Sequence, residues 1–285
     1  MFMDRLETAM KGTPHEKMIQ WHFGGYFANE LICKDCPHYS DSREPYLAVS
    51  LQVQNKKSIE ESLNAFVEGE MLEGDNAYYC DKCEKKVNTL KRICIKRLPR
   101  MLILVLKRFK FDLETMQKIK VNDYCEFPHY LNMEPYTQEG LARRDKEKER
   151  QAAGEDPMEG EEPPKLKYPK EYYEYKLRGI VVHSGTSEHG HYYSFIQDRE
   201  DTSVPEEKRW YEFNDERVRE FEIDDIADEC FGGEEKWGSM MSMAHPMLNM
   251  RSEKSRNAYL LFYERITPYE APAEEEEDIP EGSST

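Results

Sequence analysis

The 285-residue sequence predicts an α+β fold, in which a mixed or antiparallel sheet carries a small zinc-ribbon subdomain. Three observations lead to this class. Short runs of aromatic and β-branched residues, separated by turn residues, fill much of the region 172–267. Met101 to Leu106 is the most apolar run in the chain and is typical of a strand buried on both faces. Two Cys-x-x-Cys pairs, beginning at Cys33 and Cys80, indicate metal-pinned knuckles.

Composition excludes several classes of function. A net charge of −17 argues against a nucleic-acid partner, and 38% hydrophobic residues are enough for a core. No apolar run approaches the roughly 18–20 residues that span a bilayer, and the N-terminus has no signal-peptide pattern, so no membrane partner is expected. Seven cysteines, an odd number with two Cys-x-x-Cys pairs, suit a reducing compartment. The sequence therefore predicts a cytoplasmic location, with the nucleus left open.

The cysteine pairs predict a structural zinc site. Cys33, Cys36, Cys80 and Cys83 each lie among polar, turn-prone residues, and four thiolates close a tetrahedral site with no open position for water. His38 could replace one ligand, but four cysteines make it unnecessary. Between the knuckles, the sequence Ser58-x-x-Glu61 is a capping box ahead of apolar residues at helical spacing, so a helix is expected there.

The stretch 177–215 predicts acid–base chemistry. A strand-like run ends near His183, a second begins at Gly190-His191-Tyr192-Tyr193, and a third ends at Asn214-Asp215. If Asn214 or Asp215 accepts the Nδ1–H of His191, the ring presents Nε2 as a base toward a nucleophile. Gly190 would let a substrate backbone approach closely. His183 and His189 are expected to be structural.

Here the residues resemble a known family. The string VVHSGTSEHGHYYSF, followed by WYEFND, resembles the histidine box of the ubiquitin-specific proteases, papain-like cysteine peptidases that cut at the C-terminus of ubiquitin. The resemblance implies that His191 is the general base, that Asn214 orients it, and that Asp215 is a second polar member. It also implies substrate contacts at Gly190 and Tyr192. His189 is a departure, because many members have glycine there.

Further strings extend the resemblance from about residue 24 to residue 265. LPRMLILVLKRF and the later IKVNDYCEFP are similar to the palm of these proteases, and the four cysteines are similar to the ligands of their zinc-binding fingers. LEGDNAYYCDKCEKKVNTLKRICIKRLP is most similar to the very large, fat-facets-like members. The implied fold is a partial papain-like peptidase without its helical thumb.

The domain organisation follows from these matches and from composition. Residues 1–23 are expected to be the remnant of a preceding helical element, and residues 24–96 to form the zinc-ribbon fingers. The palm would comprise 97–137 and 172–267, the second part carrying the histidine box. Residues 138–171 have almost no large apolar side chains and predict a disordered insertion. Residues 268–285 predict a disordered acidic tail.

The nucleophile of the family is missing from this sequence. Its Gly-Asn-Thr-Cys box does not occur, and Cys94, Cys125 and Cys230 lack the glycine-rich, helix-opening context that lowers a thiol pKa. Two functions fit. The first is a piece of a deubiquitinase, inactive alone, whose family hydrolyses the isopeptide or peptide bond at the C-terminal Gly of ubiquitin and acts on ubiquitinated proteins. The second is a non-catalytic, zinc-ribbon scaffold that binds ubiquitin. A zinc-ribbon nucleic-acid binder is a third reading, which the acidity disfavours.

Overall fold

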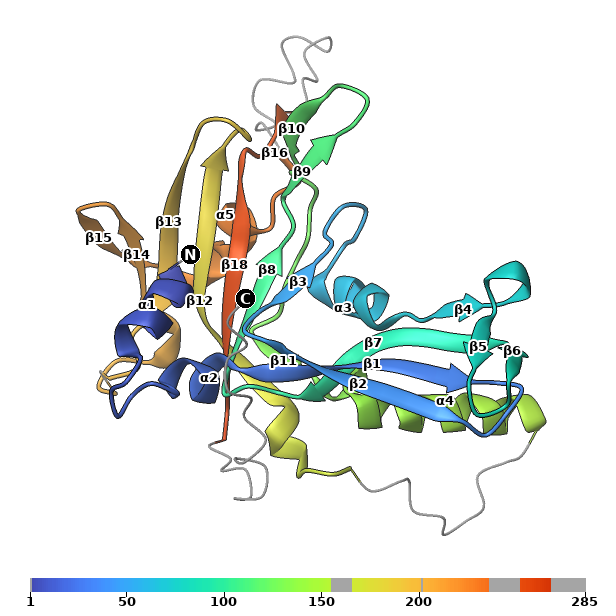
Figure 1. Cartoon of the computed structure of the whole chain (residues 1–285). Coiled ribbons are helices and arrows are strands. Elements are labelled where there is room, and N and C mark those ends of the chain that lie inside the picture. The colour runs from blue at the N-terminus through green and yellow to red at the C-terminus, as the bar shows by residue number, and fades with distance from the viewer. Residues whose placement is uncertain (1, 155–165, 201, 236–251, 268–285) are drawn as a thin grey trace.

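The computed structural model of the chain describes residues 2–154, 166–200, 202–235 and 252–267 (Figure 1). The predicted acidic tail, 268–285, lies outside these residues. Two sheets organise the molecule. The larger one stands at the left of Figure 1, and the smaller one extends from it to the right. This arrangement confirms the α+β class, with a sheet body and a projecting subdomain. No helix of the described part is long and apolar enough to cross a membrane.

The larger sheet has eight strands and corresponds to the predicted palm. It is antiparallel except for one parallel pair, β3 beside β8. Its strand order is β15 (Arg217–Phe221), β14 (Trp210–Asn214), β13 (Gly190–Gln197), β12 (Glu174–Gly185), β18 (Arg256–Arg265), β8 (Met101–Leu106) and β3 (Val49–Leu51), with β11 (Tyr130–Asn132) paired to β12.

The apolar run that the sequence singled out is strand β8. It lies between β18 and β3, and Leu102, Leu104 and Leu106 are completely buried. Every backbone polar group of such a strand pairs with a neighbour, so its side chains can be apolar on both faces. Strand β8 therefore lies in the interior of the sheet, and strand β18 separates it from the hairpin of β12 and β13.

The smaller sheet forms the fingers. Its order is β2 (Tyr39–Tyr46), β1 (Gly25–Cys33), β7 (Thr89–Arg97) and β4 (Glu70–Leu72). A separate pair, β5 (Tyr78–Cys80) and β6 (Lys85–Val87), lies at its far end (Figure 1). The predicted range 24–96 is not all fingers, however, because β3 joins the larger sheet and the intervening helix α3 (Ile59–Val67) contacts β3 as well as β7.

Helix α3 begins where the capping box predicts. The Ser58 hydroxyl accepts a hydrogen bond from the backbone N–H of Glu61, at 3.3 Å, and the Glu61 carboxylate accepts one from the N–H of Lys57. The remaining elements are shorter or peripheral. They are α1 (Phe2–Met10), α2 (Met18–Phe23), α4 (Gln138–Ala153), α5 (Ile226–Cys230), the strands β9 (Phe109–Asp112), β10 (Gln117–Lys120), β16 (Glu234–Glu235) and β17 (Ser252–Glu253), and the 3₁₀ turns η1 (Gly74–Asn76), η2 (Glu134–Tyr136), η3 (Lys170–Tyr173), η4 (Glu206–Lys208) and η5 (Ile223–Asp225).

Helix α4 contradicts the predicted disorder of residues 138–154. Thr137 caps its N-terminus by accepting from the Gly140 N–H, and Leu141 is fully buried. Asp145 forms an ion pair with Arg92 of strand β7, 2.5 Å between Oδ2 and Nη1. The composition of this stretch does not predict the helix, because the helix docks mainly through polar contacts to residues distant in sequence. Residues 155–165 lie outside the described part of the chain.

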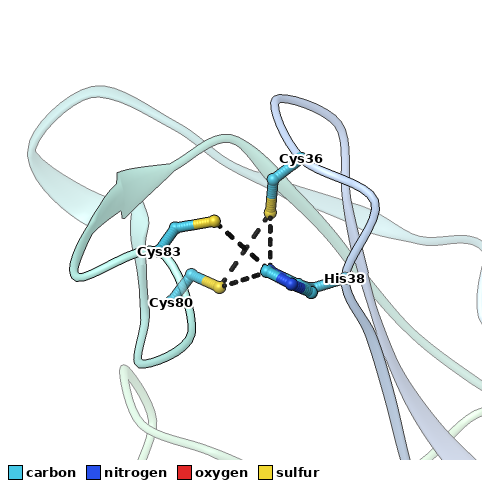
Figure 2. Close-up of side chains that lie close together, drawn as sticks. All are labelled: Cys36, His38, Cys80 and Cys83. Atoms are coloured by element: carbon cyan, nitrogen blue, oxygen red, sulfur yellow. Dashed lines mark hydrogen bonds between the residues drawn. The ribbon is translucent and has the colours of Figure 1, made fainter.

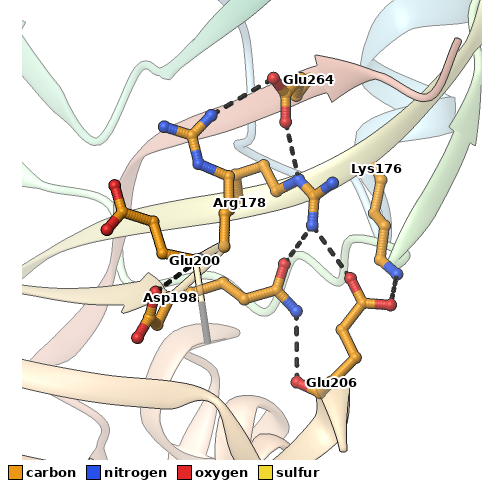
Figure 3. Close-up of polar contacts among 8 residues, drawn as sticks. Lys176, Arg178, Asp198, Glu200, Glu206 and Glu264 are labelled. Carbon is orange, nitrogen blue, oxygen red and sulfur yellow. Dashed lines mark hydrogen bonds and ion pairs between the residues drawn. The ribbon is translucent and has the colours of Figure 1, made fainter. Parts of the chain in front are cut away.

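An ionic network joins three strands at one end of the larger sheet (Figure 3). Arg178 of β12 contacts Glu264 of β18 and Glu206 of η4, each at 3.0 Å, and also Gln197 of β13. Lys176 pairs with the same Glu206. The network therefore ties β12 to both of its neighbours at the end of β13 away from His191.

Candidate functional site

The histidine lies at the start of strand β13, next to a tight turn. Strands β12 and β13 pair antiparallel, with Ser184 opposite His191 and Gly185 opposite Gly190. Gly185 adopts φ +115°, a conformation that side-chain-bearing residues rarely take, so a glycine is needed to start the turn. Strand β14 pairs with β13 on the other side and ends at Asn214. The sheet thus brings together two side chains that are 23 residues apart.

The His191 and Asn214 side chains are in direct contact. Nε2 of His191 lies 2.7 Å from Oδ1 of Asn214, and Oδ2 of Asp215 lies 3.8 Å from the same nitrogen. An amide oxygen can only accept, so Nε2 carries the proton and Nδ1 has the free lone pair. The expected pairing is therefore found, but with the opposite ring nitrogen. The sequence predicts contact through Nδ1. Which nitrogen meets Asn214 depends on the rotamer of the His191 side chain, and the sequence does not determine that rotamer.

Two residues that the sequence analysis missed hold the Asn214 amide. Its Nδ2 donates to Oε1 of Glu212, at 3.1 Å, and Glu212 is paired with Arg219 of the neighbouring strand at 2.5 and 2.8 Å. Glu212 is only 5% exposed, and a buried carboxylate requires such a partner. Glu212 and Asn214 are two apart on β14 and so lie on the same face, a period-two signal that could have identified Glu212.

No thiol contacts this imidazole. Within the described residues, the contacts of the His191 side chain are Asn214, Asp215 and the ring of Tyr193. Cys94, Cys125 and Cys230 are fully buried, and burial raises the pKa of each thiol, that of Cys125 to about 11. A buried thiol with a raised pKa is a poor nucleophile. The structure therefore supports the view that none of these cysteines acts on a substrate.

Gly190 and Tyr192 pack against His183 rather than standing free. A Cβ added at Gly190 would lie 2.1 Å from Nε2 of His183, so the ring itself requires glycine there. Burial, together with the charge of Lys120, lowers the pKa of His183, which favours a neutral, packed imidazole. Tyr192 stays half exposed, with its ring 4.8 Å from that of His183. A substrate role for Gly190 and Tyr192 remains a prediction.

A cavity of about 480 Å³ lies beside this turn. It is bounded by the β9–β10 hairpin on one side and by the residues that connect β12 to β13 on the other. Gly190 and Tyr192 belong to its lining, as do Phe109, Lys118 and His189. A substrate segment that reaches His191 from this side would pass these residues.

The predicted cluster of metal ligands is present, but one of its four members differs from the predicted set. Figure 2 shows Cys36, His38, Cys80 and Cys83 pointing toward one another, and their donor atoms all lie within 4.8 Å. Nδ1 of His38 is 3.3 Å from the sulfurs of Cys80 and Cys83 and 3.4 Å from that of Cys36. The Cys36 and Cys80 sulfurs are 3.9 Å apart. Sulfurs bound to tetrahedral zinc at ~2.3 Å lie about 3.8 Å from each other, so this spacing fits the ion.

Cys33 does not belong to this group of four, contrary to the prediction. It is the last residue of strand β1 and lies opposite Thr89 of β7, whose hydroxyl donates to the Cys33 sulfur at 3.7 Å. The strand register therefore fixes the direction of its side chain. His38 lies after the knuckle, at the entry to β2, and takes the fourth position. The sequence favoured Cys33 over His38 because four cysteines complete a site by themselves, but spacing does not show which way the Cys33 side chain points from strand β1.

The sheet body and the projecting fingers with their Cys/His cluster define a class of protein by its fold, that of the papain-like proteases with zinc-binding fingers. The sequence profile described as "Ubiquitin carboxyl-terminal hydrolase" matches residues 1–263, and the chain belongs to that family. Its relatives include the fat-facets-like members, which agrees with the resemblance seen in the fingers.

Ubiquitin carboxyl-terminal hydrolase 24 of Mus musculus is 40% identical over 272 residues, which are 95% of this chain and 10% of that protein. The probable ubiquitin carboxyl-terminal hydrolase FAF of Drosophila melanogaster is 40% identical over 266 residues, which are 92% of this chain and 9% of that protein. The chain therefore spans about a tenth of the length of these relatives.

A solved structure has the same architecture. The SAGA DUB module of Ubp8, Sgf11, Sus1 and Sgf73, bound to monoubiquitin, contains a chain that superposes with a TM-score of 0.61 and 25% identity. The match covers 91% of this chain and 45% of that chain.

Proposed function

We propose that this chain carries the general base, His191, and its orienting residue, Asn214, of a cysteine-type deubiquitinase. The substrate would be ubiquitin joined through its C-terminal glycine to another protein. The observation that carries the proposal is the 2.7 Å contact between Nε2 of His191 and Oδ1 of Asn214, in a chain that belongs to a hydrolase family. The net charge of −17 also suits a basic substrate tail.

The geometry supports a specific role for each nitrogen of the His191 ring. The nucleophilic thiol would come from outside these 285 residues and transfer its proton to Nδ1 of His191. The thiolate then attacks the carbonyl carbon of the terminal glycine, and the imidazolium returns the proton to the leaving amine. A thioester remains, which water hydrolyses with His191 again acting as base. Asn214 keeps the proton on Nε2 throughout, and Asp215 is a second polar group near that nitrogen.

The zinc would have a structural role. Cys36, His38, Cys80 and Cys83 would hold it and would join the turn between β1 and β2 to the turn between β5 and β6. Three thiolates and one imidazole complete a tetrahedral set and leave no position for a substrate. Bound zinc therefore supplies folding energy to the fingers and not chemistry.

Cleavage of a ubiquitin C-terminal fluorogenic reporter tests the proposal. The chain as given is expected to be inactive, whereas a polypeptide that continues into the preceding coding sequence and includes a Gly-Asn-Thr-Cys segment is expected to cleave. In that longer polypeptide, His191→Ala should lower kcat by about 10²–10⁴-fold, because a positioned base contributes that much. Unchanged turnover in the variant would overturn the assignment.

The alternative, a non-catalytic ubiquitin-binding scaffold, is distinguished by the same experiment. If the preceding coding sequence lacks such a cysteine while the chain still binds ubiquitin in a titration, the scaffold is the better account. The specific observation in its favour is that no cysteine among the described residues contacts His191.

A further inference from the structure

Lys120 lies at the end of strand β10, and its ammonium group contacts the backbone of two other segments. Nζ donates to the carbonyl oxygens of His183 at 2.9 Å, Gly185 at 3.3 Å and Ser255 at 2.5 Å. An ammonium has three N–H donors, and here three carbonyls converge on it. One side chain from the β9–β10 hairpin therefore joins the end of β12 to the residue just before β18.

This cation has no carboxylate partner among the described residues. All of its polar contacts are backbone carbonyls, and the half-buried ammonium group feels the charge of Arg108, a cation that is fully buried. Burial and Arg108 together lower the pKa of Lys120 to about 8. Holding a partly desolvated cation beside another cation costs free energy, so its placement calls for a positional explanation.

The three carbonyls surround the residue that sets the position of His191. Those of His183 and Gly185 flank Ser184, and Ser184 is the β12 residue paired with His191. The Ser255 carbonyl also accepts from the N–H of Gly185, at 3.0 Å. Lys120 therefore fixes β12 on both sides of the pairing that determines where His191 lies relative to Asn214.

The same hairpin also holds the tip of the turn. The Ser187 hydroxyl donates to the Lys118 carbonyl at 2.6 Å, and the Thr186 N–H donates to the His189 carbonyl at 2.8 Å. The segment from Gly185 to Gly190 is thus attached to strand β10 at its base and at its tip. Of these attachments, the one through Lys120 is nearest to the backbone that pairs with His191.

We propose that Lys120 is a positioning residue that holds the end of β12 through three carbonyl contacts and thereby keeps His191 in hydrogen-bonding contact with Asn214. Its effect on catalysis rests on the proposed function, whereas its effect on the His191–Asn214 geometry does not. The residue does not touch the reacting atoms.

The test compares Lys120→Met with a matched control, Lys107→Met, which removes an exposed lysine two residues before the hairpin. The chain as given is labelled with ¹⁵N, and the imidazole signals of His191 are recorded. In the control, the Nε2 proton should remain as slowly exchanging as in the parent. In Lys120→Met, the Nε2 proton of His191 should exchange at least about 10-fold faster, since the exchange rate rises when a hydrogen bond is lost.

A kinetic measurement accompanies this in the longer polypeptide that carries the thiol. Lys120→Met is expected to lower kcat about 10-fold while leaving KM for the ubiquitin reporter within about 2-fold, because a misplaced base affects chemistry rather than binding. Identical spectra and identical kcat for Lys120→Met and Lys107→Met would overturn the proposal.

If Lys120→Met does not fold, Lys120→Arg decides the question. A planar guanidinium cannot place its donors on three carbonyls that converge on one nitrogen, so faster exchange at His191 is expected there too. Unchanged exchange in a folded Lys120→Arg protein would contradict the proposal. Failure of the longer, thiol-containing polypeptide to cleave the reporter would refute the proposed function alone, because the imidazole signals are measured on the chain as given, without a nucleophile.

Discussion

Asn214 controls which nitrogen of His191 is basic, and its own orientation depends on Glu212. Because the amide oxygen accepts from Nε2, the amide NH₂ must point the other way, toward Glu212. Arg219 forms an ion pair with that carboxylate. The Glu212 carboxylate thus accepts hydrogen bonds from Arg219 and from the Asn214 amide, and the Asn214 oxygen accepts one from His191. Each member of this series fixes the orientation of the next, and the series ends at the half-exposed His191 ring.

Asn214→Ala should lower kcat of the longer, thiol-containing polypeptide by about 10²-fold, because the imidazole loses its fixed tautomer. KM for the ubiquitin reporter should change little. The measurement is steady-state kinetics, with Asn64→Ala as a control on the distant helix α3. A larger effect on KM than on kcat would show that Asn214 acts in binding instead.

The metal site gives a second prediction at this scale. His38→Ala should weaken zinc binding by at least about 10²-fold, whereas Cys33→Ser should leave one zinc bound per chain. Cobalt substitution distinguishes the ligand sets, since the visible absorption of Co²⁺ depends on the number of thiolates. If Cys33→Ser releases the metal and His38→Ala does not, the ligand set is the four cysteines after all.

Helix α4 is the element that sequence reasoning missed, and its docking can be measured. Leu141 is completely buried where the helix meets the sheet, so Leu141→Ala should cost about 2–3 kcal/mol of unfolding free energy. The control Lys146→Ala, on the exposed face, should change it by less than about 0.5 kcal/mol. Urea denaturation measures both. Equal effects from the two variants would mean that the helix does not pack on the fingers.

The ionic network at the end of β12 predicts a pH dependence. Lys176 and Arg178 lower the pKa of Glu206 below its usual value of 4.5, so its charged form is favoured in the folded state. The stabilisation is therefore present above pH 4.5 and is lost as pH falls through the lowered folded-state pKa. Because Glu206 is partly exposed, the contribution is roughly 1 kcal/mol.

Glu206→Gln should accordingly be less stable than the parent chain at pH 7, and the difference should be smaller at pH 3. Denaturation curves at both pH values measure the difference. A difference that is the same at the two pH values would show that Glu206 contributes through packing and not through its charge.

Across the whole molecule, sequence reasoning succeeded where a local pattern determines the structure. The run Met101–Leu106 is a buried strand, the Ser58 cap starts a helix, and His191 meets Asn214 because both occupy strand ends of one sheet. Residues 1–23, expected to be helical, contain α1 and α2. Each of these expectations depended on residues close in sequence or on a recognisable family motif.

Prediction from the sequence failed where the structure depends on contacts between segments that are distant along the chain. The ring nitrogen of His191 that meets Asn214 is set by a rotamer, and the choice of His38 over Cys33 is set by the β1–β7 register. Helix α4 is ordered through Arg92, which lies 53 positions earlier in the chain. Local composition contains none of this information, so the insertion was expected to be disordered.

The central claim is that Asn214 holds the His191 imidazole with its proton on Nε2, ready to accept another at Nδ1. The ¹⁵N spectrum of the imidazole, recorded for the chain and for Asn214→Ala, tests this most directly. We predict a single Nε2–H tautomer with a slowly exchanging proton in the parent and a rapidly exchanging, averaged ring in the variant. Indistinguishable His191 signals in the two proteins would contradict the account.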